Sequence, residues 1–241
     1  MHKSLVAVIV ASAALAGCHV HERSGGGATV SRSYQVGNFQ KIEVAGPYDV
    51  DIRTGSNPSV SAQGSEKLLD RTTVEVEGDK LVIHPENDHS FFHFGWSTHG
   101  HARFSVTVPQ LDAASIAGSG GIKIDRVQGQ SFEGTIAGSG GLDVGAMDVQ
   151  QLKLSIAGSG GVKAGAGKVQ SAQYEIAGAG SVDASAIQAQ QVKVDIAGSG
   201  GVRANASGTA DVDIMGSGDV NISGGAKCSV SKMGSGNVHC S

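Results

Sequence analysis

The chain has 241 residues with 18 basic and 22 acidic side chains, and its formal net charge is −4 at neutral pH. This balance gives no reason to expect nucleic acid or another polyanion as a partner. The 37 glycines would suggest disorder, but they recur at fixed intervals, which is typical of a repeat protein.

Residues 1–17 have the pattern of a secretory signal peptide. A charged start precedes an apolar and small-residue run from Leu5 to Ala16, which is too short for a permanent membrane span. The ending Leu15-Ala16-Gly17-Cys18 resembles the bacterial lipobox, which implies lipidation of Cys18 after cleavage. The alternative is an ordinary signal peptide that carries a cysteine.

Residues 18–29 are predicted to form the lipidated cysteine and a flexible tether, because the segment contains Ser24-Gly25-Gly26-Gly27. Two or more acyl chains anchor a protein stably to a membrane. The residue after the cysteine is His19 and not aspartate, and the resemblance to Gram-negative sorting signals implies the outer membrane. The protein would face either the periplasm or the cell surface.

Residues 30–241 are expected to form one β-solenoid domain. Within it, residues 30–110 repeat the later pattern only weakly: Ile42–Gly46 and Asp49–Ile52 share its frame, and Val74–Ile83 is a strand pair turning at Gly78. We expect irregular N-terminal coils in 30–110 and regular Gly-Ser-Gly coils in 111–241.

The interval 84–104 is an insertion rich in histidine and aromatic residues. Imidazoles suit zinc, copper or nickel, so the segment is a candidate site for a divalent transition metal. The alternatives are a surface insertion with solvated histidines, or an apolar patch that binds a ligand. The candidate metal ligands are His84, His89, His93, His99 and His101.

Seven similar segments follow, each built around Gly-Ser-Gly or a close variant. Their first glycines are four times 20 and then twice 18 residues apart. These glycines are Gly118, Gly138, Gly158, Gly178, Gly198, Gly216 and Gly234.

On both sides of each glycine pair, apolar residues alternate with polar ones, as in Leu152, Leu154 and Ile156. This alternation predicts two short strands with one buried face, joined at a glycine corner. One such coil cannot bury its own apolar face, so the coils must stack. The predicted fold is therefore all-β, a parallel β-helix with coils of about 18–20 residues.

The fifth position after each first glycine supports parallel stacking, because its charge alternates in sign from Lys123 to Arg203. Opposite charges on neighbouring strands are stabilising, whereas like charges repel. The column comprises Lys123, Asp143, Lys163, Asp183, Arg203, Asn221 and His239.

Cys228 and Cys240 fall at inward positions on the two strands of the last coil. An even pair of cysteines in an exported protein is a disulfide candidate. We expect a disulfide that closes the C-terminal coil, where Lys232 replaces the isoleucine of earlier coils.

The opening from Phe39 through Ile52, the Leu81-x-Ile83 strand and the Gly-Ser-Gly coils resemble the auto-transporter adhesin head GIN domain family. The ending Cys228 to Cys240 is similar to that of its proteobacterial lipoprotein members. The resemblance covers about residues 34–241. It implies a right-handed β-helix in a bacterial envelope protein and supplies no catalytic residues.

No residues are predicted to be catalytic. The column of corner serines from Ser119 to Ser235 lacks a base and an oxyanion hole, and turn chemistry explains it. We expect a non-catalytic, outer-membrane-anchored scaffold with an adhesin-like role and an unidentified protein or glycan ligand. The alternatives are a periplasmic metal- or ligand-binding lipoprotein that uses residues 84–104 and, third, a polysaccharide-acting enzyme.

Overall fold

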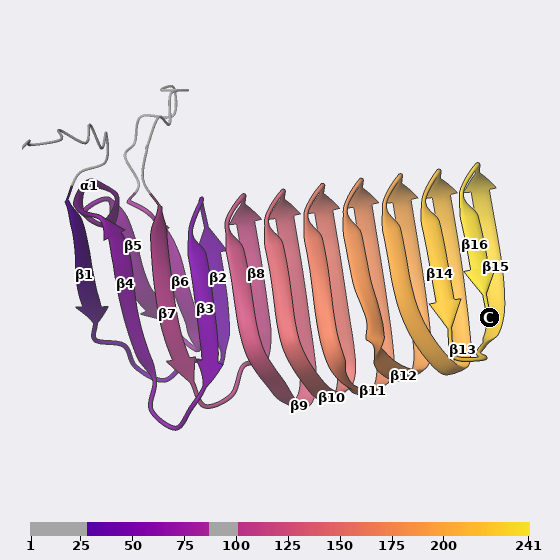
Figure 1. The fold of residues 1–241 in the computed structure, drawn as a ribbon, viewed down its shortest axis with the longest axis horizontal. Helices are drawn as coiled ribbons and strands as arrows, with labels where there is room; N and C mark the ends of the chain where they lie inside the picture. Colours follow the sequence, from indigo (N-terminus) through magenta and orange to yellow (C-terminus); the bar gives the residue numbers. More distant parts are fainter. Residues whose placement is uncertain (1–27, 87–100) are drawn as a thin grey trace, which may run out of the picture.

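The computed structural model describes residues 28–86 and 101–241. Strands make up nearly all of it and stack along one axis into a β-solenoid of about six turns (Figure 1). The predicted all-β solenoid is therefore confirmed.

The regular part of the solenoid begins at Ala113, and each coil pairs in parallel and in register with the next. Gly141 lies opposite Gly161, and Gly158 lies opposite Gly178, so residues 20 apart are direct neighbours. The strands of this part are β8 (Ala113–Gly118), β9 (Gly121–Gly138), β10 (Gly141–Gly158), β11 (Gly161–Gly178), β12 (Ser181–Gly198), β13 (Gly201–Gly216), β14 (Asp219–Ser223), β15 (Lys227–Gly234) and β16 (Asn237–Cys240).

The corners between strands require glycine for two separate reasons. Gly158, the first glycine of its corner, has φ +132°, and a Cβ there would lie 2.3 Å from the carbonyl oxygen of Gly138 in the previous coil. Gly160 has no such φ, but its Cβ would lie 2.6 Å from the oxygen of Gly140. The corner thus combines positive φ with close backbone stacking, and both exclude a side chain.

The core is a set of apolar columns that run along the solenoid axis. In the isoleucine column every side chain is at most 3% exposed, and burying one such side chain stabilises the fold by roughly 1.5–3 kcal/mol. This column comprises Ile116, Ile136, Ile156, Ile176, Ile196 and Ile214.

The N-terminal end is irregular and several of its strands run antiparallel, among them the pair predicted in Val74–Ile83, which forms β5 and β6. β1 pairs with β4, β4 with β7, and β5 with β6, all antiparallel. Antiparallel strands can be joined by short turns such as Gly78 between β5 and β6, whereas parallel pairing needs a complete coil. The elements here are β1 (Thr29–Tyr34), β2 (Lys41–Ala45), β3 (Asp49–Thr54), β4 (Ser59–Ser65), α1 (Glu66–Leu69), β5 (Thr72–Glu77), β6 (Lys80–Pro85) and β7 (Ala102–Val108).

At this end, the order in which the strands stack also differs from their order along the chain. β2 lies between β6 and β8, and β3 lies between β7 and β9. The chain therefore forms β2 and β3 and continues with β4 to β7 on their outer side. It then returns to the other side of β2 and β3, where β8 and β9 begin the regular coils.

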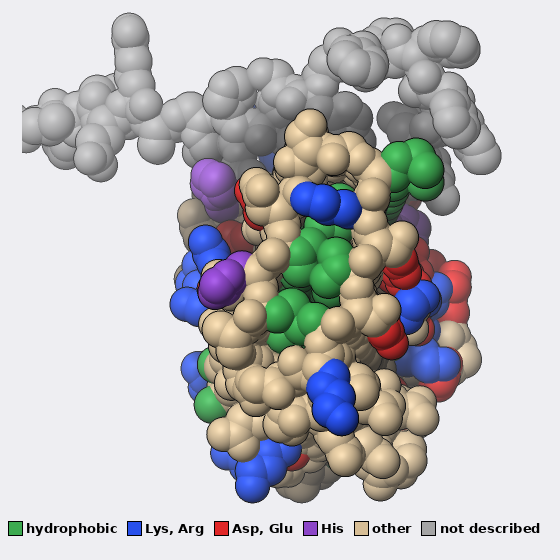
Figure 2. All heavy atoms as spheres, turned by 90° about the vertical axis from the view of Figure 1, so that its right-hand side faces the viewer, with side chains coloured by type: hydrophobic (Ala, Val, Ile, Leu, Met, Phe, Trp, Pro, Cys, Tyr) green, Lys and Arg blue, Asp and Glu red, His purple; other side chains and the backbone are tan. Residues whose placement is uncertain are grey.

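The C-terminal coil is the open end of the core. Figure 2 shows hydrophobic side chains framed by the backbone at this end, and Val230 is 46% exposed. Lys232 pairs with Ile214 of the previous coil, and its Nζ donates a hydrogen bond to the carbonyl oxygen of Gly236 (3.2 Å). Cys228 and Cys240 form a disulfide in the structure. A loop of this length stabilises by roughly 3 kcal/mol on the chain-entropy model.

The corner geometry gives a direct test. Gly158→Ala forces a side chain into positive φ and against the Gly138 carbonyl, so we expect a loss of roughly 2–4 kcal/mol in the free energy of unfolding. Gly141→Ala is the matched control, since the nearest atom to its added Cβ is 4.0 Å away. Urea unfolding measures both variants. Equal stability of the two would contradict this account of the corner.

Candidate functional site

A shallow groove of about 570 Å³ runs across strands β9 to β13 and β15 on one face of the solenoid. Its floor holds the residue just before each corner glycine, which is alanine in four coils and methionine in the last two. We call this feature the alanine groove. Its floor column comprises Ala137, Ala157, Ala177, Ala197, Met215 and Met233.

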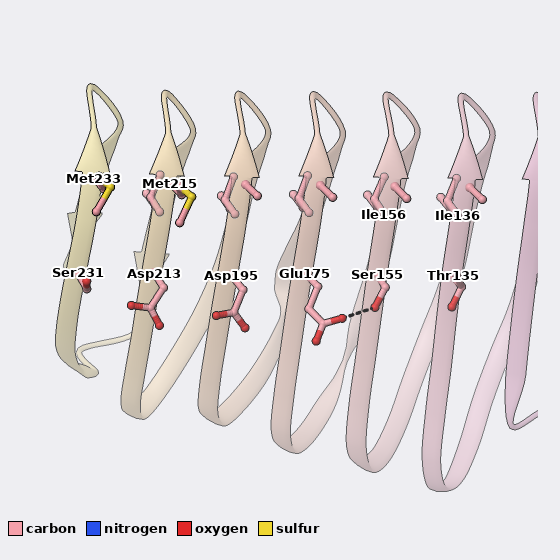
Figure 3. A pocket seen from close by; sticks show the side chains of 17 residues that line it. Thr135, Ile136, Ser155, Ile156, Glu175, Asp195, Asp213, Met215, Ser231 and Met233 are labelled. Atoms are coloured by element: carbon pink, nitrogen blue, oxygen red, sulfur yellow. Dashed lines mark hydrogen bonds between the residues drawn. The ribbon is translucent and has the colours of Figure 1, made fainter.

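One wall of the alanine groove is a polar column, two residues before the floor position in each coil (Figure 3). The wall changes along the axis from hydroxyl groups to carboxylates and back to one hydroxyl. Parallel, in-register pairing places these side chains roughly 4.8 Å apart. The wall comprises Thr135, Ser155, Glu175, Asp195, Asp213 and Ser231.

Glu175 is the most heavily contacted carboxylate of this wall. Its Oε2 accepts a hydrogen bond from Ser155 Oγ (2.9 Å) and lies 3.2 Å from Lys153 Nζ, and its Oε1 accepts one from Gln173 Nε2 (2.8 Å). Partial burial alone would raise the pKa of Glu175, but the Ser155 hydrogen bond and Lys153 outweigh it and lower the pKa. Glu175 is therefore an ion at neutral pH.

The wall is acidic in β11, β12 and β13. Asp195 is paired with Lys193 at 3.1 Å, and this hydrogen bond raises the pKa of the lysine. Within residues 28–86 and 101–241, Asp211 and Asp213 make no ion pair. The methionine end of the groove thus combines an apolar floor with unneutralised carboxylates.

The two methionines stand out from the rest of the surface. Met215 is 64% exposed and Met233 is 71% exposed, and they lie on paired positions of adjacent strands. Methionine is flexible and polarizable, so exposed methionines suit an adaptable binding surface. A groove of this size, apolar with a few aligned polar groups, fits the binding of an elongated ligand.

The histidine prediction is only partly within the described residues. His89, His93 and His99 lie outside them, as does Cys18. His84 belongs to β6, where its Nδ1 lies 2.7 Å from the Pro85 carbonyl oxygen and its Nε2 lies 3.3 Å from Glu75. His101 precedes β7 and is exposed. In the described part of the chain, no three His, Cys, Asp or Glu side chains are arranged to hold a metal ion.

The corner serines lie where turn chemistry places them. The backbone N–H of Ser139, for example, donates to the carbonyl oxygen of Gly118 (2.9 Å), and Ser159 repeats this contact one coil later. These bonds tie successive corners together. Among the described residues, no helix is long and apolar enough to span a membrane.

Sequence analysis missed the alanine groove, although its signal was present. Reading the residue immediately before each corner glycine gives five alanines, from Ala117 to Ala197, followed by Met215 and Met233. An unbroken run of small residues that ends in large apolar ones indicates a floor with a change in depth.

A comparison with protein families matches residues 38–226 to the family described as putative auto-transporter adhesin, head GIN domain. A comparison with curated protein sequences gave no match.

Three solved structures share the fold. A putative adhesin from Bacteroides fragilis is 22% identical with a TM-score of 0.78, over 88% of this chain and 97% of the other. A putative adhesin from Parabacteroides merdae is 17% identical with a TM-score of 0.69, over 89% and 97%. A putative lipid binding protein from Parabacteroides distasonis is 25% identical with a TM-score of 0.68, over 90% and 98%.

The contacts of Glu175 predict how stability depends on pH. Because its pKa is lower in the folded chain than its ordinary value, its charge stabilises the fold above the ordinary pKa, and this is lost as pH falls through the lowered pKa. As pH falls from about 5 to about 3, we expect the Tm of Glu175→Gln to decrease by less than the Tm of the wild type. Ser155→Ala, which removes one hydrogen bond, should show part of the same change. Identical pH profiles for Glu175→Gln and the wild type would refute this role.

Proposed function

The chain belongs to the putative auto-transporter adhesin, head GIN domain family, and we propose that it is a non-catalytic, outer-membrane lipoprotein with an adhesin-like role. Its solenoid would hold an elongated ligand along the alanine groove. The observation that carries this proposal is the continuity of that groove over six successive strands.

The rigidity of the groove supports binding over catalysis. Each floor and wall residue is fixed by an in-register ladder on both sides, except at the last coil. A repeated row of similar groups offers many equivalent contacts to a long partner, as solenoid surfaces commonly do. A catalytic site instead needs unlike groups brought together at one point.

A polypeptide fits the groove better than a glycan does. Sugar rings bind on exposed aromatic faces, but the two aromatic residues of the regular coils, Phe132 and Tyr174, are each 1% exposed. The floor is made of methyl and thioether groups, and the carboxylates lie along one wall. The matching partner is an extended peptide with small apolar side chains and basic residues on one side.

The anchor is the second part of the proposal. Its support is the sequence Leu15-Ala16-Gly17-Cys18 and the glycine-rich segment after it. Acylation at Cys18 would hold the solenoid to the membrane by its N-terminal end and leave the methionine end of the groove farthest along the axis from that attachment.

Location is the first test. On intact cells that express the full chain, added protease should digest the protein, because an adhesin must face outward. The Cys18→Ser chain should be released from the membrane fraction, and permeabilised cells show the total amount that protease can reach. Protection on intact cells, lost only on permeabilisation, would exclude a surface adhesin.

The groove itself is tested by filling it. Ala177→Tyr places a ring across the floor midway along, and we expect it to abolish attachment of expressing cells to surfaces coated with matrix proteins. Ala166→Tyr, on the same strand and also exposed, is the matched control and should attach like the wild type. Attachment to purified mucin glycans in place of protein would overturn the polypeptide assignment. Equal attachment by cells that express Ala177→Tyr and Ala166→Tyr would show that the alanine groove is not part of the binding surface.

A further inference from the structure

A second surface lies on another part of the coils and is built from charged side chains. Strand pairing places one residue from each of six successive strands in a single column, where the sign of the charge alternates without exception. We call this column the charge ladder. It comprises Asp51, Lys123, Asp143, Lys163, Asp183 and Arg203.

The structure extends the ladder beyond the column seen in the sequence. Asp51 comes from β3, which is stacked directly on β9, so it adds a sixth charge of the correct sign. The column two residues before the ladder is small in the regular coils: it is glycine in β9, β10, β11 and β13 and serine in β12, and Asp49 occupies it in β3. The ladder borders a groove of about 540 Å³.

The charged side chains of the ladder point outward and do not form ion pairs with one another. Lys123, Asp143, Lys163 and Arg203 are exposed. Among the residues that the structure describes, no ion pair joins two members of the ladder. Asp183 is held by Ser185, whose Oγ donates to Oδ1 at 2.7 Å, and this bond with the nearby cations lowers its pKa.

An alternating ladder with an even number of charges has a symmetry property. From Asp51 to Arg203 the signs run minus, plus, minus, plus, minus, plus, and read backwards every sign is reversed. Two copies placed face to face with their axes antiparallel therefore oppose unlike charges at every position. The two-fold axis then runs parallel to the strands and passes between Asp143 and Lys163.

We propose that the charge ladder is a homotypic interface at which two copies of this chain associate in this antiparallel arrangement. Three distinct pairs, each formed twice, define it: Asp143 with the second copy's Lys163, Lys123 with its Asp183, and Asp51 with its Arg203. This interface lies on a different surface from the alanine groove, and the proposal does not rest on what that groove binds.

The flanking positions fit the same two-fold axis. In the column beside the ladder, Arg103 of β7 and Asp219 of β14 lie equally far from the centre, so Arg103, whose Nε lies 3.6 Å from Asp51 of its own chain, also faces Asp219 across the axis. Gly141 faces Gly161, and Gly121 faces Ser181, so no side chain larger than serine separates the central parts of the two faces. Within these paired columns, no like charges oppose each other.

The ladder also selects against other arrangements. With the axes parallel, each ladder residue would face its own copy, and like charges would oppose at every position. A shift of one coil in the antiparallel arrangement has the same result. Like charges brought together across an interface strongly disfavour association. The alternation therefore favours the unshifted antiparallel arrangement, in which all six charges of each copy meet an opposite charge, and the association should weaken as salt screens the charges.

Sedimentation equilibrium of the full Cys18→Ser chain, which lacks the lipid, tests the proposal. We expect a monomer–dimer equilibrium at about 20 mM salt that shifts to monomer at about 500 mM. Asp143→Lys and Lys163→Asp should each raise the dimer Kd about tenfold or more, because each places like charges opposite each other at the centre.

Mixing the two variants is the decisive step. In a heterodimer of Asp143→Lys with Lys163→Asp, the lysines of one copy face the aspartates of the other at both central positions. The equimolar mixture should therefore dimerise like the wild type, and so should the double variant Asp143→Lys/Lys163→Asp. A mere folding defect would not be rescued by mixing.

Asp148→Lys and Lys168→Asp are the matched controls. They make the same charge changes on the same strands, five residues further along and outside the ladder, and should leave the dimer Kd unchanged. A wild-type chain that stays monomeric at low salt, or single variants that dimerise as the wild type does, would overturn the proposal.

Discussion

Every feature of this protein depends on the corner at which two strands meet over the corner of the previous coil. The first glycine of the corner takes a positive φ that other residues resist, and the carbonyl oxygen below it occupies the space of a Cβ. A corner that cannot accept a side chain can stack on a copy of itself in only one register. Once that register is set, the other positions of the regular coils fall into columns, each either buried and apolar or facing outward.

The sequence was sufficient to predict these columns. The spacing of the glycines gives the length of each coil, and the alternation of apolar and polar residues indicates which side chains are buried. The isoleucine column, the alternating charges and the inward positions of Cys228 and Cys240 all follow from counting. The N-terminal end could not be predicted in this way. There β2 and β3 are covered by strands from later in the chain, and the pairing of Asp51 with Lys123 joins residues 72 apart, with no repeat to relate them. Nonlocal contacts of this kind leave no periodic signal.

The two candidate binding surfaces differ in how clearly the sequence indicates them. The charge ladder is visible in the sequence because the signs of its side chains are unusual in their order. The alanine groove is defined by what is small, and alanine before a glycine attracts no attention until the coils are stacked. Its character comes from the contrast between four methyl groups and Met215 and Met233, which line up once the coils are stacked side by side (Figure 3).

The alternating sign of the ladder has a consequence for how such a chain can change in length. Solenoids grow by duplication of their repeats, and here the duplication of a single coil would set two like charges side by side and make the total odd. Duplication or loss of two coils together preserves both the alternation and the even number. The natural unit of growth for this protein is therefore a pair of coils, a parity rule that the core and the corners alone would never impose.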